Sequence, residues 1–114
     1  MSYSAVQGDV IWLDFDPRAG HEQIGRCPAI IASNEVANRL MRPMAVVCPI
    51  TSADKWYPTR VHFEGQRIRG YIMCDQMRTA DLSARYAEFI EKAPDDVLNE
   101  VLDIIVGMVE RLPA

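Results

Sequence analysis

Short apolar segments separated by turn-forming residues recur through the first ninety residues of this chain, and this repeated pattern is the feature that most constrains its fold. Their β-branched and aromatic content favours strands over helices. The segments that we expect to form strands are Asp9–Phe15, Pro28–Ser33, Met44–Ile50, Thr59–Glu64, Gly70–Asp75 and Tyr86–Ile90. A series of short strands at roughly ten-residue spacing predicts a mainly β fold, a small barrel of about six or seven strands.

Two features refine the predicted barrel. In the first strand, side chains alternate between two faces, with Val10, Trp12 and Asp14 on one and Ile11, Leu13 and Phe15 on the other. Pro49 lies inside the third expected strand. Because proline cannot donate a ladder hydrogen bond, we expect a sheet edge or a bulge there.

Two segments have helical spacing instead. Asn34–Met41 predicts a short helix with Ser33 as its N-cap. Near the C-terminus, Pro94 suits the first position of a helix, and Asp95 and Asp96 complement the helix dipole. An amphipathic stripe follows, formed by Val97, Leu98, Val101, Leu102, Ile105, Met108, Val109 and Leu112. We expect this C-terminal α-helix to cover a barrel face or a partner.

The length of 114 residues predicts a single domain over residues 1–114. The net charge of −4 at first argues against a nucleic-acid-binding protein. However, residues 88–114 contain seven acids and two bases, whereas residues 1–87 contain nine acids and ten bases. The acidity is therefore concentrated in the C-terminal segment, and a locally basic cleft elsewhere remains compatible with the composition.

Several features predict a cytoplasmic protein. The N-terminus has no basic region followed by an apolar stretch, so we expect no secretory signal. The longest apolar runs, such as Met44–Cys48, are too short to span a membrane. Cys27, Cys48 and Cys74 are odd in number and form no CxxC pair, which argues against a disulfide framework and a zinc site.

The segment from Gly20 to Arg26 is the first candidate for chemistry. It places His21, Glu22, Gln23 and Arg26 in a loop flanked by glycines. Phosphodiester chemistry needs a base, an acid and a cation for the charge that develops on phosphorus. A solvated polar loop is the more common role for such a set of residues.

Two further clusters carry weaker signals. Residues 74–81, which include Asp75, follow an apolar strand, where functional side chains often lie, but a turn held by Asp and Thr hydrogen bonds fits them equally. In the segment from Pro49 to Ser52, the hydroxyl groups of Thr51 and Ser52 can simply bond the local backbone.

The order of these motifs is more specific than any one of them. The motifs are Gly8-Asp9-Val10-Ile11-Trp12, Pro17-Arg18-Ala19-Gly20-His21-Glu22-Gln23, Pro28, Pro49-Ile50-Thr51-Ser52, Gly70-Tyr71-Ile72, Asp75-Gln76-Met77-Arg78-Thr79 and Asp81. In this order and spacing they resemble the MazF/PemK/Kid toxins of type II toxin-antitoxin systems. The tail around Asn99-Glu100-Val101-Leu102 resembles the Kid/PemK branch in particular. The resemblance extends from Gly8 to the final helix.

That resemblance implies a dimeric SH3-like barrel closed by a C-terminal helix. It also implies a sequence-selective endoribonuclease that cuts single-stranded RNA without a metal or other cofactor. In such enzymes the ribose 2′-OH attacks the neighbouring phosphate and leaves a 2′,3′-cyclic phosphate and a 5′-OH end. A cognate antitoxin encoded beside the toxin neutralises it, and DNA is contacted only indirectly, through that antitoxin.

The resemblance also assigns roles to individual residues. Asp75 is the candidate general base, His21 orients or stabilises the phosphate, Thr51 contacts it, and Arg26 is a candidate catalytic cation. The residues expected to bind RNA are Glu22, Gln23, Ser52, Gln76, Arg78 and Arg85. Trp56 and Tyr57 are candidate platforms for base stacking, although packing in a core or at its rim is the more common role.

Two positions depart from the family pattern. Cys27 stands where members commonly carry an arginine before Pro28, and Met73 stands where the Kid branch places an arginine proposed as general acid. Arg26 adjoins Cys27, but neighbouring side chains of a strand point to opposite faces, so Arg26 is not a simple replacement. Cleavage by the 2′-OH needs no cysteine nucleophile, so we expect no catalytic thiol at Cys27.

Three hypotheses follow from these departures. The first is an active endoribonuclease in which Arg26, Arg78 or Arg85 supplies the missing positive charge. The second is a catalytically weak or inactive member that binds RNA or antitoxin. The third is a gyrase inhibitor like CcdB, which the sequence disfavours because that class uses a hydrophobic-aromatic C-terminal end, and this chain ends Arg111-Leu112-Pro113-Ala114.

Overall fold

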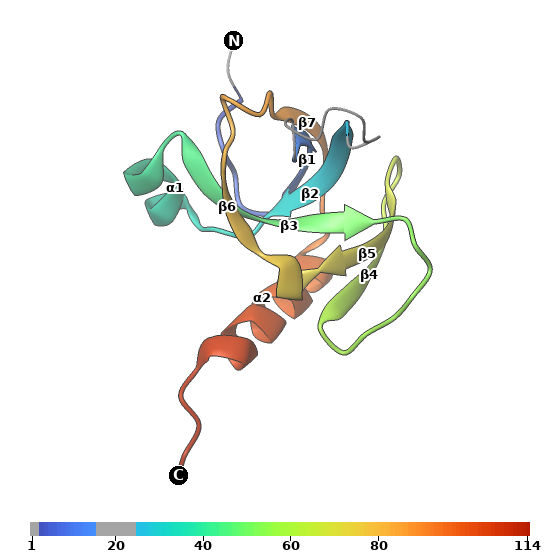
Figure 1. Ribbon diagram of the computed structural model, residues 1–114, viewed down its shortest axis with the longest axis vertical. Coiled ribbons are helices and arrows are strands. Elements are labelled where there is room, and N and C mark those ends of the chain that lie inside the picture. Colours follow the sequence, from blue (N-terminus) through green and yellow to red (C-terminus); the bar gives the residue numbers. More distant parts are fainter. Residues whose placement is uncertain (1–2, 16–24) are drawn as a thin grey trace.

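A strongly curled antiparallel sheet with two helices forms the body of the protein (Figure 1). The computed structural model describes residues 3–15 and 25–114. In chain order, the elements are β1 (Asp9–Asp14), β2 (Arg26–Ile31), α1 (Glu35–Met41), β3 (Met44–Thr51), β4 (Arg60–Glu64), β5 (Arg69–Met73), the short 3₁₀ helix η2 (Cys74–Gln76), β6 (Arg78–Asp81), β7 (Glu88–Lys92) and α2 (Asp95–Val109). The mainly β prediction, with one short helix and a C-terminal helix, is confirmed.

Strand β3 is the centre of the sheet. In the described part of the chain the strand order is β4-β5-β3-β2-β1-β7, and β6 also pairs with β3. Strand β2 lies along one side of β3, while β6 pairs with Met44–Val47 and β5 with Ile50–Thr51. Of the two settings expected for Pro49, a sheet edge or a bulge, the edge was wrong because β3 lies inside the sheet. Pro49 is tolerated in a central strand because it falls in the gap between the stretches that β6 and β5 occupy.

The boundaries of several other elements differ from the expected ones. The segment expected as a strand over Gly70–Asp75 ends at Met73, after which the chain turns into η2. Strand β6 was not anticipated. The N-cap of α1 is Asn34 rather than Ser33, because the Asn34 side chain accepts a hydrogen bond from the Ala37 backbone N–H at 3.0 Å.

Two apolar clusters fill the two faces of the curled sheet. The first cluster lies between the sheet and α2 and contains Val10, Ile30, Cys48, Ile50, Val61, Phe63, Ile72, Cys74 and Val101, among others. The second cluster contains Ile11, Leu13, Ala29, Ile31, Ala45, Val47, Ala80 and Leu82, with Phe15, Tyr3 and Ala87 packed against it. The alternation expected along β1 is confirmed, because successive side chains join the first and second clusters in turn.

Helix α2 packs across the first cluster, and its C-terminal end projects beyond the sheet. Val101 is fully buried against the sheet, and Pro94 occupies the cap position one residue before the helix. The last turn carries exposed apolar side chains, and the tail after it extends away from the body (Figure 1). Neither α1 nor α2, the helices of the described chain, has the length and hydrophobicity needed to cross a lipid bilayer.

Candidate functional site

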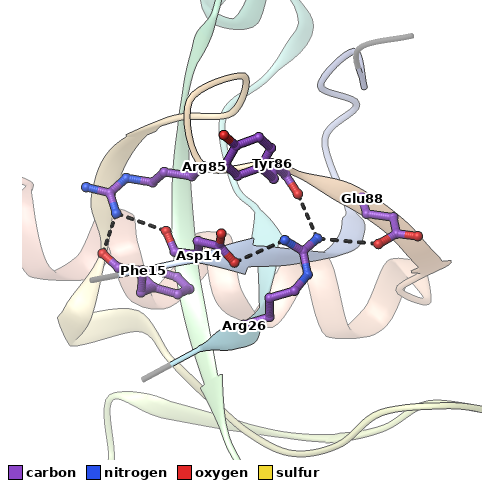
Figure 2. A network of polar contacts seen from close by, with 6 residues as sticks. All are labelled: Asp14, Phe15, Arg26, Arg85, Tyr86 and Glu88. Atoms are coloured by element: carbon purple, nitrogen blue, oxygen red, sulfur yellow. Dashed lines mark hydrogen bonds and ion pairs between the residues drawn. The ribbon is translucent and has the colours of Figure 1, made fainter. Parts of the chain in front are cut away.

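Arg26 is fixed at the corner where β1 ends and where β2 and β7 begin (Figure 2). Its Nη1 lies 3.0 Å from Asp14 Oδ1, the carboxylate directly across the β1–β2 ladder. Its Nη2 donates to the Tyr86 carbonyl oxygen at 2.7 Å and lies 3.4 Å from Glu88 Oε1. The guanidinium thus joins three segments of the chain through one carbonyl and two carboxylates.

Arg85 approaches the same corner from the other side (Figure 2). Its Nη1 donates to the carbonyl oxygen of Asp14 at 2.9 Å and also to that of Phe15. These bonds hold the end of β1, from which the chain continues into residues 16–24. The predicted site residues His21, Glu22 and Gln23 lie in that segment, outside the described residues.

The β1–β2 register places Arg26 and Cys27 on opposite faces of the sheet. Arg26 lies opposite Asp14, whereas Cys27 lies opposite Leu13, a member of the second apolar cluster. Because adjacent side chains of a strand alternate, the Cys27 side chain projects toward the second cluster and the Arg26 side chain away from it. The half-buried Cys27 therefore has a different environment from its neighbour.

Arg78 lies on the same face of the sheet as Cys27. It is the first residue of β6 and pairs with Val47, which also belongs to the second cluster. Its guanidinium carbon lies 5.5 Å from the centre of the Phe15 ring, a cation–π arrangement. The side chain is exposed to solvent.

Thr51 ends β3 and lies opposite Tyr71 of β5. Its Oγ1 accepts a hydrogen bond from the Ala53 backbone N–H at 3.1 Å, as the local-bonding alternative anticipated, and Ser52 beside it is exposed. Gly70 is required here, because a Cβ atom at this position, with φ of +152°, would overlap the Thr51 carbonyl oxygen. The backbone around Thr51 is thus tightly fixed.

Asp75 lies in η2, which packs against β3. The flanking Cys74 is buried, while Asp75 and Gln76 are exposed. The hydrogen bond with Cys74 and burial raise the pKa of the Cys48 thiol, and the nearby Asp75 charge raises it further. Asp75 directly follows Cys74, the hydrogen-bond partner of Cys48 in β3.

The predicted site residues thus divide into two groups. The first group lies on or beside β3. Thr51 is its last residue, Asp75 lies in η2 packed against it, and Arg78 pairs with its Val47. Arg26 and Arg85 are instead tied to the end of β1 (Figure 2). Within residues 3–15 and 25–114, no three His, Cys, Asp or Glu side chains gather as a metal-ion site would require.

One surface near this site was not assigned from the sequence. The outer face of the β4–β5 hairpin carries His62 directly across from Tyr71, with ring centres 5.2 Å apart. The Arg60 guanidinium carbon lies 4.9 Å from the centre of the exposed Tyr57 ring. Because Tyr71 also pairs with Thr51, this basic and aromatic surface is continuous with the end of β3. The sequence offered only Trp56 and Tyr57, since the cross-strand pairing that completes the surface depends on the register.

Comparison with known proteins identifies the family. The model of the PemK-like, MazF-like toxins of type II toxin-antitoxin systems matches residues 6–108. The chain belongs to this family. It is 40% identical over 105 residues to the endoribonuclease PemK of Escherichia coli, covering 87% of this chain and 78% of PemK. It is 34% identical over 110 residues to the endoribonuclease toxin ChpB of E. coli K12, covering 91% of this chain and 93% of ChpB.

Solved structures agree with this assignment. MazF of Deinococcus radiodurans superposes with a TM-score of 0.82 at 35% identity, covering 96% of this chain and 99% of that one. A MazE–MazF structure from the same organism gives a TM-score of 0.84 at 32% identity, covering 96% of this chain and 100% of the matched chain. The MazF-like fold and the toxin family expected from the motifs are confirmed, and the relatives are endoribonucleases. That activity favours a nuclease over a gyrase inhibitor.

Proposed function

We propose that this chain is the toxin of a type II toxin-antitoxin system and cleaves single-stranded RNA sequence-selectively without a metal ion. The observation that carries the proposal is the family match over residues 6–108, with endoribonucleases at 34–40% identity. Thr51 at the end of β3 and Asp75 in η2, which packs against β3, support a site that holds one phosphodiester between them.

The proposed chemistry uses the nucleophile that RNA itself carries. Asp75 accepts the proton of the ribose 2′-OH, and the 2′-oxygen forms a bond to the adjacent phosphorus. The bond from phosphorus to the 5′-oxygen breaks, and that oxygen takes a proton from water, while His21 orients or stabilises the phosphate. Thr51 contacts the phosphate. The products are a 2′,3′-cyclic phosphate and a 5′-OH end.

The surface of the β4–β5 hairpin supports single-stranded RNA as the substrate. Unpaired bases stack on exposed aromatic side chains, and arginine adds attraction to the phosphate backbone. Tyr57, Arg60, His62 and Tyr71 offer both features on one face, next to Thr51. A base beside the scissile phosphate would meet Tyr71 first.

We also propose a cognate antitoxin and a homodimer as partners. D. radiodurans MazF, 29–35% identical over the superposed chains, is found both alone and with MazE. The exposed apolar end of α2 is a surface that a second copy would cover.

The decisive experiment incubates the purified toxin with a long unstructured RNA in excess EDTA and maps the fragment ends. We expect discrete cuts with 5′-OH and 2′,3′-cyclic phosphate ends. Asp75→Asn should slow cleavage by about 10²–10⁴-fold, the usual worth of a positioned general base, because it removes the proton acceptor. Asp103→Asn, which changes an exposed carboxylate on α2, is the matched control and should cleave at the wild-type rate.

A second function is favoured by one observation, the replacement of two family arginines by Cys27 and Met73. Under it, the protein binds RNA or antitoxin without cutting. Intact RNA from a folded, antitoxin-free sample would contradict the nuclease proposal and support this binding module. Equal cleavage by the wild type and Asp75→Asn would instead refute the assignment of the base.

A further inference from the structure

We infer that Arg78 supplies the positive charge that stabilises the reacting phosphate, in place of the two family arginines that this chain lacks. The inference rests on the proposed endoribonuclease function and names a further catalytic residue for it. Cleavage through a pentavalent phosphorus concentrates negative charge on the non-bridging oxygens. A preorganised cation there contributes on the order of 10²–10³ in rate. Cys27 and Met73 cannot contribute it.

Arg26 is the nearest arginine in sequence to the missing position, but it is already engaged. Its guanidinium bonds the carboxylates of Asp14 and Glu88 and the carbonyl of Tyr86. It also projects from the opposite face of β2 to Cys27, because the two residues pair with Asp14 and Leu13 respectively. Moving Arg26 to a substrate would break three contacts and require crossing the sheet.

Arg85 is engaged in a different way. Its Nη1 bonds the backbone carbonyls of Asp14 and Phe15, and the side chain is partly buried. Because those carbonyls lie at the end of β1, releasing Arg85 would loosen that end of the strand. Arg85 therefore stabilises the corner, because its N–H groups are used in hydrogen bonds to backbone carbonyl oxygens.

Arg78 differs from both. In residues 3–15 and 25–114 its guanidinium has no hydrogen-bonded or ion-paired carboxylate, and its recorded contact is the face of the Phe15 ring at 5.5 Å. A cation on an aromatic face keeps its N–H donors available at its edge. Those donors match the oxygens of a phosphate in a bidentate geometry.

The register brings this guanidinium to the region of the missing arginine. Cys27 lies directly across from Leu13, and Phe15 is two residues further along the same chain and on the same face. If the β1–β2 register is continued one step past Asp14, Phe15 becomes a diagonal neighbour of Cys27, at about 7–8 Å. Arg78, in contact with Phe15, thus lies on the same face of the sheet as Cys27, on the side where an arginine at residue 27 would project.

Arg78 is also near the candidate base in the chain. Only Gln76 and Met77 separate it from Asp75, and both η2 and β6 adjoin β3. The same short connection therefore carries a proton acceptor at one end and a cation at the other. We therefore expect a phosphate held between Thr51 and Asp75 to lie within reach of the Arg78 guanidinium as well.

The test measures single-turnover cleavage at saturating RNA, in EDTA, for Arg78→Ala, Arg78→Lys and Arg39→Ala. Arg78→Ala should lower the maximal rate by about 10²–10³-fold, the usual worth of one charge-stabilising donor. The rate of Arg78→Lys should lie between those of Arg78→Ala and the wild type, since lysine keeps the positive charge but cannot bind a phosphate through two parallel N–H donors. Arg39→Ala removes an exposed arginine of α1, which pairs with Glu35, and should leave the rate unchanged.

A rescue variant separates catalysis from folding and from simple RNA binding. Adding Cys27→Arg to Arg78→Ala should restore the rate to within about tenfold of the wild type, because it returns the charge to the same place. If Arg78→Ala raises only the RNA concentration needed for half-maximal rate, Arg78 binds the backbone and the inference is wrong. It is equally wrong if Arg78→Ala cuts at the wild-type rate. Failure of the wild-type protein itself to cut refutes the proposed function instead.

Discussion

Asp9 is a carboxylate buried at the start of β1, with only 3% of its surface exposed. It accepts a hydrogen bond from the Tyr3 hydroxyl and one from Lys92 Nζ at 2.8 Å. Burial raises the pKa of Tyr3, and the hydrogen bond to Asp9 raises it further, so the hydroxyl stays protonated as a donor. Through this carboxylate the N-terminal segment is fastened to β1 and to β7, over the second apolar cluster.

We therefore predict that Tyr3→Phe lowers the free energy of unfolding by about 1–3 kcal/mol, because it leaves a buried carboxylate short of one donor. Tyr86→Phe is the matched control. Its ring is exposed, so we expect a change below about 0.5 kcal/mol. Urea unfolding followed by fluorescence measures both variants. Equal midpoints for Tyr3→Phe and the wild type would show that the buried hydrogen bond contributes nothing.

At the residue scale, the sequence predicts short-range geometry better than partners. Strand alternation predicted that Arg26 and Cys27 would point apart, and the register agrees. It did not predict the partners of Arg26, since Tyr86 and Glu88 lie about sixty positions away and meet it only because β7 pairs with β1. The contact of Arg78 with Phe15 was hidden for the same reason. The roles of His21, Glu22 and Gln23 stay predictions.

At the scale of elements, one side chain of β7 holds the β4–β5 hairpin. The Glu91 carboxylate accepts hydrogen bonds from the backbone N–H groups of Gln66, Arg67 and Ile68 at 2.8–3.0 Å. Partial burial tends to raise the pKa of Glu91, but these three donors and the Arg67 charge together hold it below its ordinary value. Gly65 completes the arrangement, because a Cβ there would lie 2.5 Å from a Glu91 carboxylate oxygen.

We predict that Glu91→Gln destabilises the protein by about 1 kcal/mol at pH 7, a value reduced for solvent screening because Glu91 is only partly buried. The lowered pKa means that the stabilisation is present above pH 4.5, the ordinary value, and is lost as the pH falls through the folded-state pKa. The difference between wild type and variant in urea unfolding should therefore shrink below pH 4.5. A difference that is constant from pH 7 to pH 3 would contradict a role for the charge. Glu110→Gln, beyond the end of α2, is the control.

Element prediction failed where pairing, rather than pattern, defines the strand. Strand β6 is only four residues long and contains Arg78 and Asp81, so its apolar signal is weak, and it becomes a strand because β3 offers it a partner. Pro49 predicted an edge where the structure has a central strand. Its missing N–H is harmful only where a neighbouring strand needs that donor, and Pro49 lies between the stretches that pair with β6 and β5. The α2 stripe was predicted well as far as Val109 because its periodicity is local, but Leu112 lies in the tail beyond the helix.

At the scale of the whole molecule, the end of α2 leaves an apolar surface uncovered. Met108 and Val109 in the last turn of the helix stripe are exposed, Val109 by 70%, and Leu112 in the tail after the helix is 72% exposed. The earlier part of the same stripe, including Val97, Leu98 and Val101, is packed on the first cluster. One stripe thus serves the core at its beginning and projects from the body at its end, where a second copy of the chain would bury it.

We predict a homodimer that depends on this end of α2. Light scattering after size-exclusion chromatography should give about twice the 12.9 kDa monomer mass for the wild type. Val109→Lys should weaken dimerisation at least about tenfold, or 1.4 kcal/mol, because a charge is costly in an apolar interface. Lysine at a helix C-terminus also complements the dipole, so loss of the dimer would not reflect loss of the helix.

The control for that variant is Val36→Lys, which puts the same charge on an exposed valine of α1 and should leave the dimer intact. A monomeric wild type at high concentration would refute the dimer. A Val109→Lys protein that dimerises like the wild type would place the interface on another face. If the Val109→Lys monomer also stops cutting RNA while remaining folded, the site along β3 requires the second subunit. If the monomer retains cleavage, each β3 site is complete within one chain, and the dimer serves RNA or antitoxin binding instead.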